Sequence, residues 1–262
     1  MKKNSIFVQN GITYAIVIAC WILVQILTAT GNMTSLLKGL LVPLCIYVIL
    51  AVSLNLTVGI LGELSLGHAG FMCVGAFTGA FFTKCMENVI PSVGMRFFLA
   101  LIIGAAVAGV FGIIINIPVL RLKGDYLAIV TLAFGEIIKN LINVMYVGLD
   151  SNGFHFSIKD TTSLGMGADG VVIIKGAQGI TGTPKAATFT VLLTLFIVLN
   201  LINSRTGRAI MSIRDNRIAA ESVGINITKY KLMAFAISAA LAGVAGVLYA
   251  HNLSSLAATP KN

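Results

Sequence analysis

Charged residues are scarce in this sequence of 262 residues, and their scarcity excludes a soluble globular fold. Asp, Glu, Lys and Arg make up only 10% of the chain, whereas hydrophobic residues make up 57%. Soluble domains carry roughly 25% charged residues, and several apolar runs here are long enough to cross a bilayer. The composition therefore predicts an all-α, polytopic helical membrane protein.

The sequence also lacks the features of most enzymes and nucleic-acid-binding proteins. There is no nucleotide-binding loop of the G-x-x-x-x-G-K-[ST] kind, and no paired carboxylates or nucleophile with a base outside the apolar runs. The net charge is +9, but the basic residues are spread between apolar runs with no aromatic-basic patch. The cysteines, which are Cys20, Cys45, Cys73 and Cys85, have no metal-ligand spacing. We therefore expect no catalytic activity, no metal or cofactor and no nucleic-acid partner.

The apolar segments predict a single transmembrane domain. We place seven spans at about 12–29, 37–56, 64–83, 97–119, 126–146, 187–202 and 232–250. The first could mimic a signal peptide, but its length favours an uncleaved span. With this count five of the six arginines lie on the side of the N-terminus and only Arg96 lies on the other. We therefore predict a cytoplasmic N-terminus, an external loop at 148–186 and a cytoplasmic loop at 203–231, with the opposite orientation as the alternative.

The third span is rich in glycine and hydroxyl groups. Glycine at the density found between Gly62 and Gly70 predicts a broken or re-entrant helix, which is tolerated at membrane depth where protein or water covers the backbone. Close helix packing is the alternative, particularly for Gly75 and Gly79, which have small-x-x-x-small spacing. Ser65 and His68 are candidates for the lining of a pathway, although a packed, hydrogen-bonded role would also suit them.

Two later spans carry features of their own. Glu136 falls near the middle of the fifth span, where a charge needs a partner or water. Lys139 follows at a spacing that allows an ion pair within the helix, so Glu136 either locks packing or faces a pathway or a partner subunit. In the last span, Ala239-x-x-x-Gly243 and Ala242-x-x-x-Gly246 predict tight helix contact.

The long charged stretch lies between Arg205 and Lys231. Its pattern from Gly207 to Gly224 predicts a short amphipathic helix, whose apolar stripe consists of Ile210, Ile213, Ala220 and Val223. Such a helix, held between two spans, can dock its stripe in a groove of a partner. A basic loop that only sets orientation and touches anionic lipid is the alternative.

Three stretches resemble one family. Leu64–Phe71 with Gly75-Ala76-Phe77, the string Arg121–Ile138, and the loop Ile218–Asn226 are similar to the LIV-type permeases, which are the membrane subunits of branched-chain amino acid ABC importers. The second string resembles the M-type subunit in particular. The loop resembles the Ala-Ala-x-x-x-Gly signature that docks on the ATPase, with Ile218 in place of the acidic residue of its general form.

The resemblance implies a function that composition alone does not. It implies a bacterial inner-membrane permease for leucine, isoleucine and valine, a homologous second permease subunit, two ATP-binding cassette subunits and an extracytoplasmic substrate-binding protein. Related permeases handle urea, short amides or other amino acids. The family continues beyond the point where this chain stops, so a C-terminally short permease is expected. The residues implied in ATPase coupling are Gly207, Arg208, Arg214, Arg217, Ala219, Ala220 and Gly224.

Two other classes of function stay open. A self-contained secondary transporter or channel for a small polar solute would use Glu136 and His68 to relay protons. A non-transporting assembly fragment would insert in the membrane and bind partners without any uptake.

Overall fold

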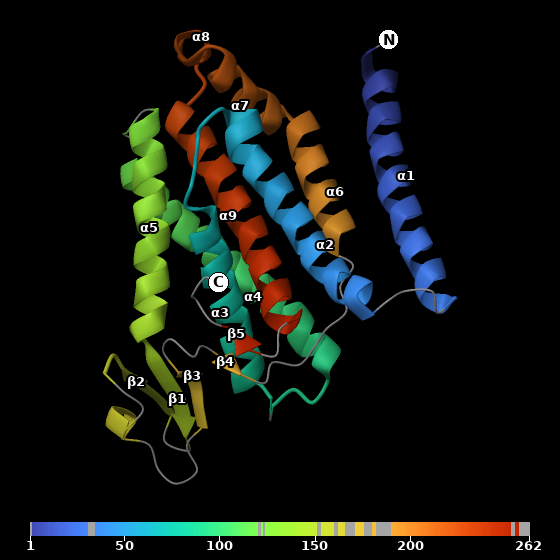
Figure 1. The fold of residues 1–262 in the computed structure, drawn as a ribbon. Helices are drawn as coiled ribbons and strands as arrows, with labels where there is room; N and C mark the ends of the chain where they lie inside the picture. Colours follow the sequence, from blue (N-terminus) through green and yellow to red (C-terminus); the bar gives the residue numbers. More distant parts are fainter. Residues whose placement is uncertain are drawn as a thin grey trace.

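The structure is a computed structural model that is predominantly helical, as predicted (Figure 1). It describes residues 2–30, 35–87, 89–119, 122, 124–150, 153–159, 162–165, 171–175, 180–181, 190–252 and 255–256. The helices are α1 (Lys2–Ala29), α2 (Ser35–Asn55), the π-helical turn η1 (Leu56–Leu61), α3 (His68–Cys85), α4 (Val93–Val119), α5 (Asp125–Val144), η2 (Thr162–Leu164), α6 (Thr190–Asn203), α7 (Arg205–Asp215), α8 (Arg217–Ser222) and α9 (Ile227–Asn252). The strands are β1 (Tyr146–Asp150), β2 (Gly153–Ser157), β3 (Val171–Lys175), β4 (Ile180–Thr181) and β5 (Ser255–Leu256).

Helix α9 forms the centre of the bundle and packs against α2, α3 and α4. Small residues allow this close packing. A Cβ atom added to Gly243 would lie 2.5 Å from Cβ of Ala108 on α4, and one added to Gly246 would lie 2.8 Å from the backbone N of Ala76 on α3. A Cβ on Gly75 would meet the backbone of Gly243. The tight contact predicted for both small-residue faces of the last span, and for Gly75, is therefore confirmed.

Helices long and apolar enough to cross a membrane account for four of the predicted spans. Within the described residues these helices are Leu40–Leu61, Val93–Val119, Tyr126–Val144 and Ile227–Asn252. Helices α1, α3 and α6 coincide with the other three predicted segments, and the full count of seven stays a prediction. The last helix starts at Ile227, so the first residues of α9 come from the stretch predicted as a cytoplasmic loop.

The glycine-rich stretch interrupts the helix where the sequence predicted a break. Residues 62–67 have no regular secondary structure, and α3 begins only at His68. In Figure 1 this segment descends from the top of α2 beside α9 and reaches α3 well below the top of the bundle. The predicted span at 64–83 is therefore an extended segment followed by a helix.

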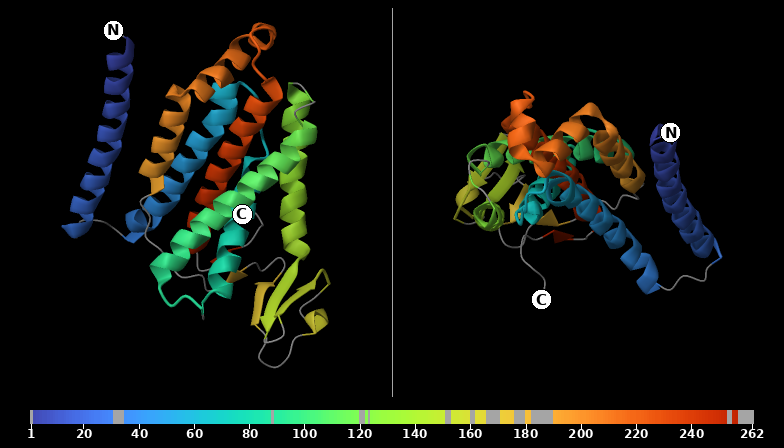
Figure 2. Two further views of the ribbon diagram at one scale, coloured as in Figure 1. Left: turned by 180° about the vertical axis from the view of Figure 1, so that it is seen from behind. Right: turned by 90° about the horizontal axis from the view of Figure 1, so that it is seen from above.

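The segments predicted to face the cytoplasm gather at one end of the bundle. Figure 2 shows the N-terminus, η1, the start of α5 and the α7–α8 pair at the same end, which is the top of Figure 1. The end of α3, the start of α4 and the strands β1–β3 lie at the opposite end. This arrangement agrees with the predicted alternation of sides.

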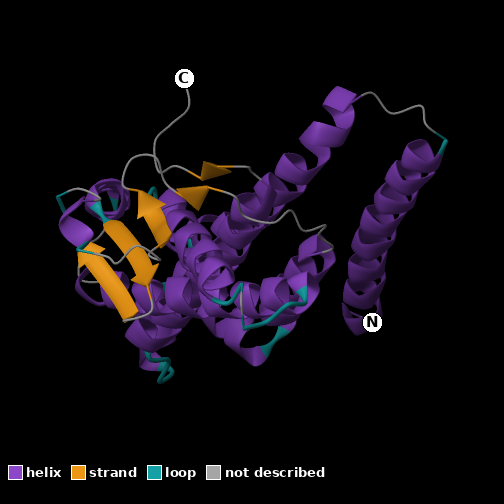
Figure 3. Cartoon of the chain, turned by 90° about the horizontal axis from the view of Figure 1, so that it is seen from below, coloured by secondary structure: helices purple, strands orange, loops and turns teal. Residues whose placement is uncertain are grey.

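The segment predicted as an external loop at 148–186 contains short strands, and its place outside the membrane stays a prediction. Strands β2, β1 and β3 form an antiparallel sheet in that order, with Tyr146 opposite Ser157 and a register shift between Val147 and Gly148 (Figure 3). The β-branched and aromatic residues of GFHFS and VVIIK favour strands. The prediction of a loop relied on the glycines between these strand sequences, because glycine is typical of turns and loops.

Candidate coupling and translocation site

Helix α7 is held against the bundle by its cap and its apolar face. Ser204 accepts a hydrogen bond from the amide of Gly207 at 3.1 Å, which satisfies one of the free amides of the first turn. Ile210 is fully buried, and Ile213 is buried with Ile227 of α9. A Cβ on Gly207 would lie 2.7 Å from the carbonyl carbon of Ile202, so only glycine lets α7 approach the end of α6 this closely.

A second helix follows where one continuous helix was predicted between Gly207 and Gly224. The backbone is extended at Asn216, whose side chain accepts a hydrogen bond from the amide of Ala219 at 3.1 Å and starts α8. Gly224, at φ +87°, ends the pair with a conformation that favours glycine. The single-helix prediction is wrong because an asparagine cap interrupts the apolar period.

The break also changes which residues face outwards. Ala220 is only 3% exposed and packs beside Ile213, whereas Val223 is 76% exposed because it lies beyond the end of α8. Three residues of the predicted apolar stripe, Ile210, Ile213 and Ala220, therefore pack against the chain itself. The prediction that Val223 belongs to the same stripe is wrong. Ile218 is 82% exposed. We call the exposed residues Arg217, Ile218, Ala219 and Val223 the docking surface, after the role that the sequence analysis predicts for this stretch and that stays a prediction.

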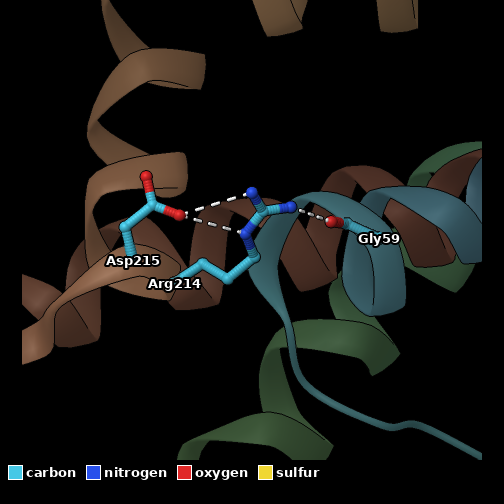
Figure 4. Close-up of polar contacts among 3 residues, drawn as sticks. All are labelled: Gly59, Arg214 and Asp215. Atoms are coloured by element: carbon cyan, nitrogen blue, oxygen red, sulfur yellow. Dashed lines mark hydrogen bonds and ion pairs between the residues drawn. The ribbon is translucent and has the colours of Figure 1, made fainter.

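Two arginines implied in ATPase coupling have partners within the chain. Arg208 donates from Nη1 to the carbonyl oxygen of Asn203 at 3.1 Å. Arg214 donates from Nη1 to the carbonyl oxygen of Gly59 at 2.6 Å and pairs with Asp215 at 3.3 Å (Figure 4). Arg214 therefore connects α7 to the turn η1.

A second charged contact lies beside this connection. Lys231 of α9 forms an ion pair with Glu63, and both side chains are largely buried. No sequence pattern pairs Glu63 with Lys231, because the two residues are 168 positions apart. Opposite charges that border two spans on the same side were the signal that could have suggested this pair.

Between these contacts and α3 runs the extended segment Gly62–Gly67. Leu66 donates its amide to Oγ1 of Thr131 on α5 at 3.0 Å. Ser65 is 3% exposed, and its Oγ has no hydrogen-bond partner in the described part of the chain. Leu64 and Leu66 are about half exposed, so one side of this irregular segment is uncovered within this chain.

Ser53 connects His68, at the start of α3, with α2 and α9. Nε2 of His68 lies 2.7 Å from Oγ of Ser53 on α2, and Ser238 of α9 donates from Oγ to the carbonyl oxygen of Ser53 at 2.6 Å. Both serines and the histidine are buried. This geometry matches the packed, hydrogen-bonded interpretation of His68.

Glu136 and Lys139 form the predicted ion pair on α5. The side chain of Glu136 is 55% exposed, so the pair lies on the face of α5 that the rest of this chain leaves open. Gly135, its neighbour, lies against Gly67, which puts the pair level with the start of α3. Ser65 and His68 are therefore both buried near the start of α3 without a hydrogen bond between their side chains in the described part of the chain, while Glu136 lies at the same level on an exposed face of α5.

No group of three or more metal-binding side chains occurs among the residues that the structure describes. His155 pairs with Asp150 at 3.2 Å within the sheet. The cysteines are all free thiols. Among the described residues, His155 therefore takes part in a contact between side chains of the sheet.

Comparison with known proteins agrees with this architecture. A family profile described as "Branched-chain amino acid transport system / permease component" matches residues 36–259. The chain is 36% identical over 219 residues to the high-affinity branched-chain amino acid transport system permease protein LivM of Salmonella typhimurium, and 36% identical over 220 residues to that of Escherichia coli. In both cases the match covers 78% of this chain and 50% of the relative.

A more distant relative is the probable branched-chain amino acid transport permease protein LivM of Methanocaldococcus jannaschii, with 27% identity over 230 residues, 78% of this chain and 64% of that protein. No solved structure gives a significant match. The chain thus spans about half the length of the first two relatives. The profile match and these identities together show that this chain belongs to the family of permease components of branched-chain amino acid transport systems.

Proposed function

We propose that this chain is a membrane subunit of an ATP-driven importer that moves branched-chain amino acids across the bacterial inner membrane. The observation that carries the proposal is the docking surface, where Ile218 and Val223 expose apolar side chains to water on a capped helix pair. Exposed apolar groups of this size on a rigid element are typical of a contact with another protein. An ATP-binding cassette subunit is the partner that fits a permease of this family.

The remaining subunits follow from the same proposal. A homologous second permease and a second ATPase subunit complete the complex, and a binding protein delivers the substrate at the end that carries β1–β3. Leucine, isoleucine and valine are the proposed substrates because the relatives are described as branched-chain amino acid permeases. The free energy for switching between outward and inward states comes from ATPase contacts that differ between the two states. Moving such an equilibrium from 1:99 to 99:1 requires about 5.5 kcal/mol.

Uptake into proteoliposomes tests this function. The vesicles would contain the chain, its second permease and the ATPase, with binding protein and labelled leucine on the opposite side from ATP. We expect uptake that requires both ATP and the binding protein. Uptake driven by a proton gradient alone would favour a secondary transporter, and assembly without any uptake would favour a non-transporting fragment.

The exposed ion pair of Glu136 and Lys139 gives a separate prediction. A charged pair near the middle of the bilayer must face protein or water, so we propose that it faces the pathway between the two permeases. Glu136→Gln leaves Lys139 without its partner and should lower uptake about tenfold, with little loss of assembled complex. Uptake and the yield of complex would be measured together.

A matched control is available at the end of α3. Lys84 and Glu87 form a pair with the same sequence spacing at 3.5 Å, outside the apolar part of the bundle. Glu87→Gln should change uptake by less than about twofold, because exposed pairs contribute little. If Glu136→Gln lowers assembly as much as uptake, the pair has a packing role and the pathway role is wrong.

A further inference from the structure

The carbonyl oxygen of Gly59 is one of the last acceptors of the continuous helix formed by α2 and η1. Helix ends leave such carbonyls without partners in the helix and carry partial negative charge. Arg214 Nη1 donates to this oxygen at 2.6 Å, although the two residues are 155 positions apart (Figure 4). A cation from α7 therefore caps the end of a different helix, and the two elements are connected at this point.

The side-chain stem of Arg214 also lies against the turn that follows. Gly62 has φ +79°, and a Cβ atom there would lie 2.5 Å from Cγ of Arg214. Glycine is required at this position both for the backbone conformation and for the passage of the arginine stem. Arg214 thus contacts the helix end and the turn together.

The other side of the turn is fixed to a different element. Glu63, the residue after Gly62, pairs with Lys231 of α9, and both side chains are largely shielded from water. Gly59 is therefore connected to α7 and Glu63 to α9, with Gly62 between them. Any displacement of α7 relative to α9 has to be taken up within these few residues, where the backbone torsion of Gly62 can change most easily.

We infer that Arg214 is a positioning residue that transmits movement of the docking helices to the extended segment Gly62–Gly67, and is not itself an ATPase contact. The inference rests on the proposed function and adds the route of coupling. Movement of α7 shifts the end of the α2–η1 helix, because Arg214 is hydrogen-bonded to the carbonyl oxygen of Gly59. The backbone torsions of Gly62 then change, and the extended segment takes a new position. Leu64 and Ser65 lie in that segment, so its movement changes the surface beside α5.

Variants of Arg214 test the inference in the assembled transporter. In Arg214→Gln we expect normal co-purification of the ATPase and normal ATP hydrolysis, but about tenfold less substrate moved per ATP. A hydrogen bond to a charged group corresponds to a change of about this size or more. Arg214→Lys keeps a cation that can reach the same carbonyl, and it should recover at least about half of the parental uptake.

The control is Arg217, which is exposed on the docking surface. Arg217→Gln should weaken ATPase association and leave the amount of substrate moved per ATP unchanged in the complexes that form. If Arg214→Gln loses the ATPase as Arg217→Gln does, or transports like the parent, the inference is wrong. Failure of the parental complex to use ATP would instead refute the proposed function.

A labelling measurement follows the extended segment directly in complexes that retain the ATPase. Cysteine in place of Leu64, which is about half exposed, reports on the extended segment. Its alkylation rate should change at least about threefold on ATP binding in the parent and in Arg214→Lys. In Arg214→Gln the rate should no longer respond to ATP, and a response equal to that of the parent would contradict the inference.

Discussion

Replacement of Ile218 by arginine is expected to remove the ATPase from the purified complex and to abolish uptake. Ile218 is the most exposed large apolar residue of the docking surface, at 82%. A charge there would be buried without a partner on binding, and central interface residues of this kind contribute about 2 kcal/mol or more. Association should therefore weaken at least about thirtyfold. Co-purification and the affinity of the ATPase for the permease in detergent measure this effect.

The same substitution at the opposite end of the molecule is the matched control. Ile158 follows β2 and is 61% exposed. Ile158→Arg should leave ATPase association unchanged, because β2, which Ile158 follows, lies at the opposite end of the molecule from α8 (Figure 1). An ATPase that binds Ile218→Arg as tightly as the parent would mean that the docking surface lies elsewhere.

Leucine in place of Gly75 or Gly246 is expected to prevent accumulation of folded protein in the membrane. Gly75 meets the backbone of Gly243, and Gly246 meets the backbone of α3 at Met72 and Ala76, so neither neighbour can turn away as a side chain would. Overpacking of a close helix contact costs about 1–3 kcal/mol when side chains can move, and these contacts with backbone should cost more. The yield and melting temperature of the purified protein measure the effect.

Gly94→Leu is the control for these variants. Gly94 lies in the first turn of α4, and a Cβ atom there meets nothing within 4 Å. We expect the yield of this variant to stay within about twofold of the parent, because exposed substitutions usually change stability by less than about 0.5 kcal/mol. Equal yields for Gly94→Leu and Gly75→Leu would show that the contact between α3 and α9 is not as close as the structure has it.

The sequence predicts the helical class and the helix contacts well because both depend on local composition. Apolar runs locate most helices, and small-x-x-x-small spacing locates the contacts of Gly75, Gly243 and Gly246. The glycine-rich stretch predicts an interrupted helix, which the structure has at residues 62–67. The Glu136–Lys139 pair follows from helical spacing alone.

The contacts that define the coupling route could not be predicted in the same way. Arg214 meets Gly59 across 155 positions, and Lys231 meets Glu63 across 168. Periodicity places a residue on a face of its own helix but says nothing of which distant loop lies opposite. The resemblance therefore implied Arg214 in ATPase coupling, and nothing in its spacing indicated Gly59 as its partner.

The sequence did not predict which residues of α7 and α8 are exposed, because the break between the two helices depends on the single residue Asn216. Asn216 can be accommodated inside a helix or can cap the start of a new one, and the sequence pattern favoured the first. Once Asn216 caps α8, the phase of the helix shifts and Val223 falls beyond its end. The exposed residues are then Ile218 and Val223, while Ala220 stays buried.

The most direct test of the account is the side of the membrane on which the docking surface lies. Cysteine at position 218 would be labelled with a membrane-impermeant maleimide in inside-out and right-side-out vesicles, with the unsubstituted chain as background. We predict labelling only in inside-out vesicles, and protection of Ile218→Cys when the ATPase subunit is bound. Labelling from the outside in right-side-out vesicles would put α7 and α8 beyond the reach of any ATPase and would contradict the account.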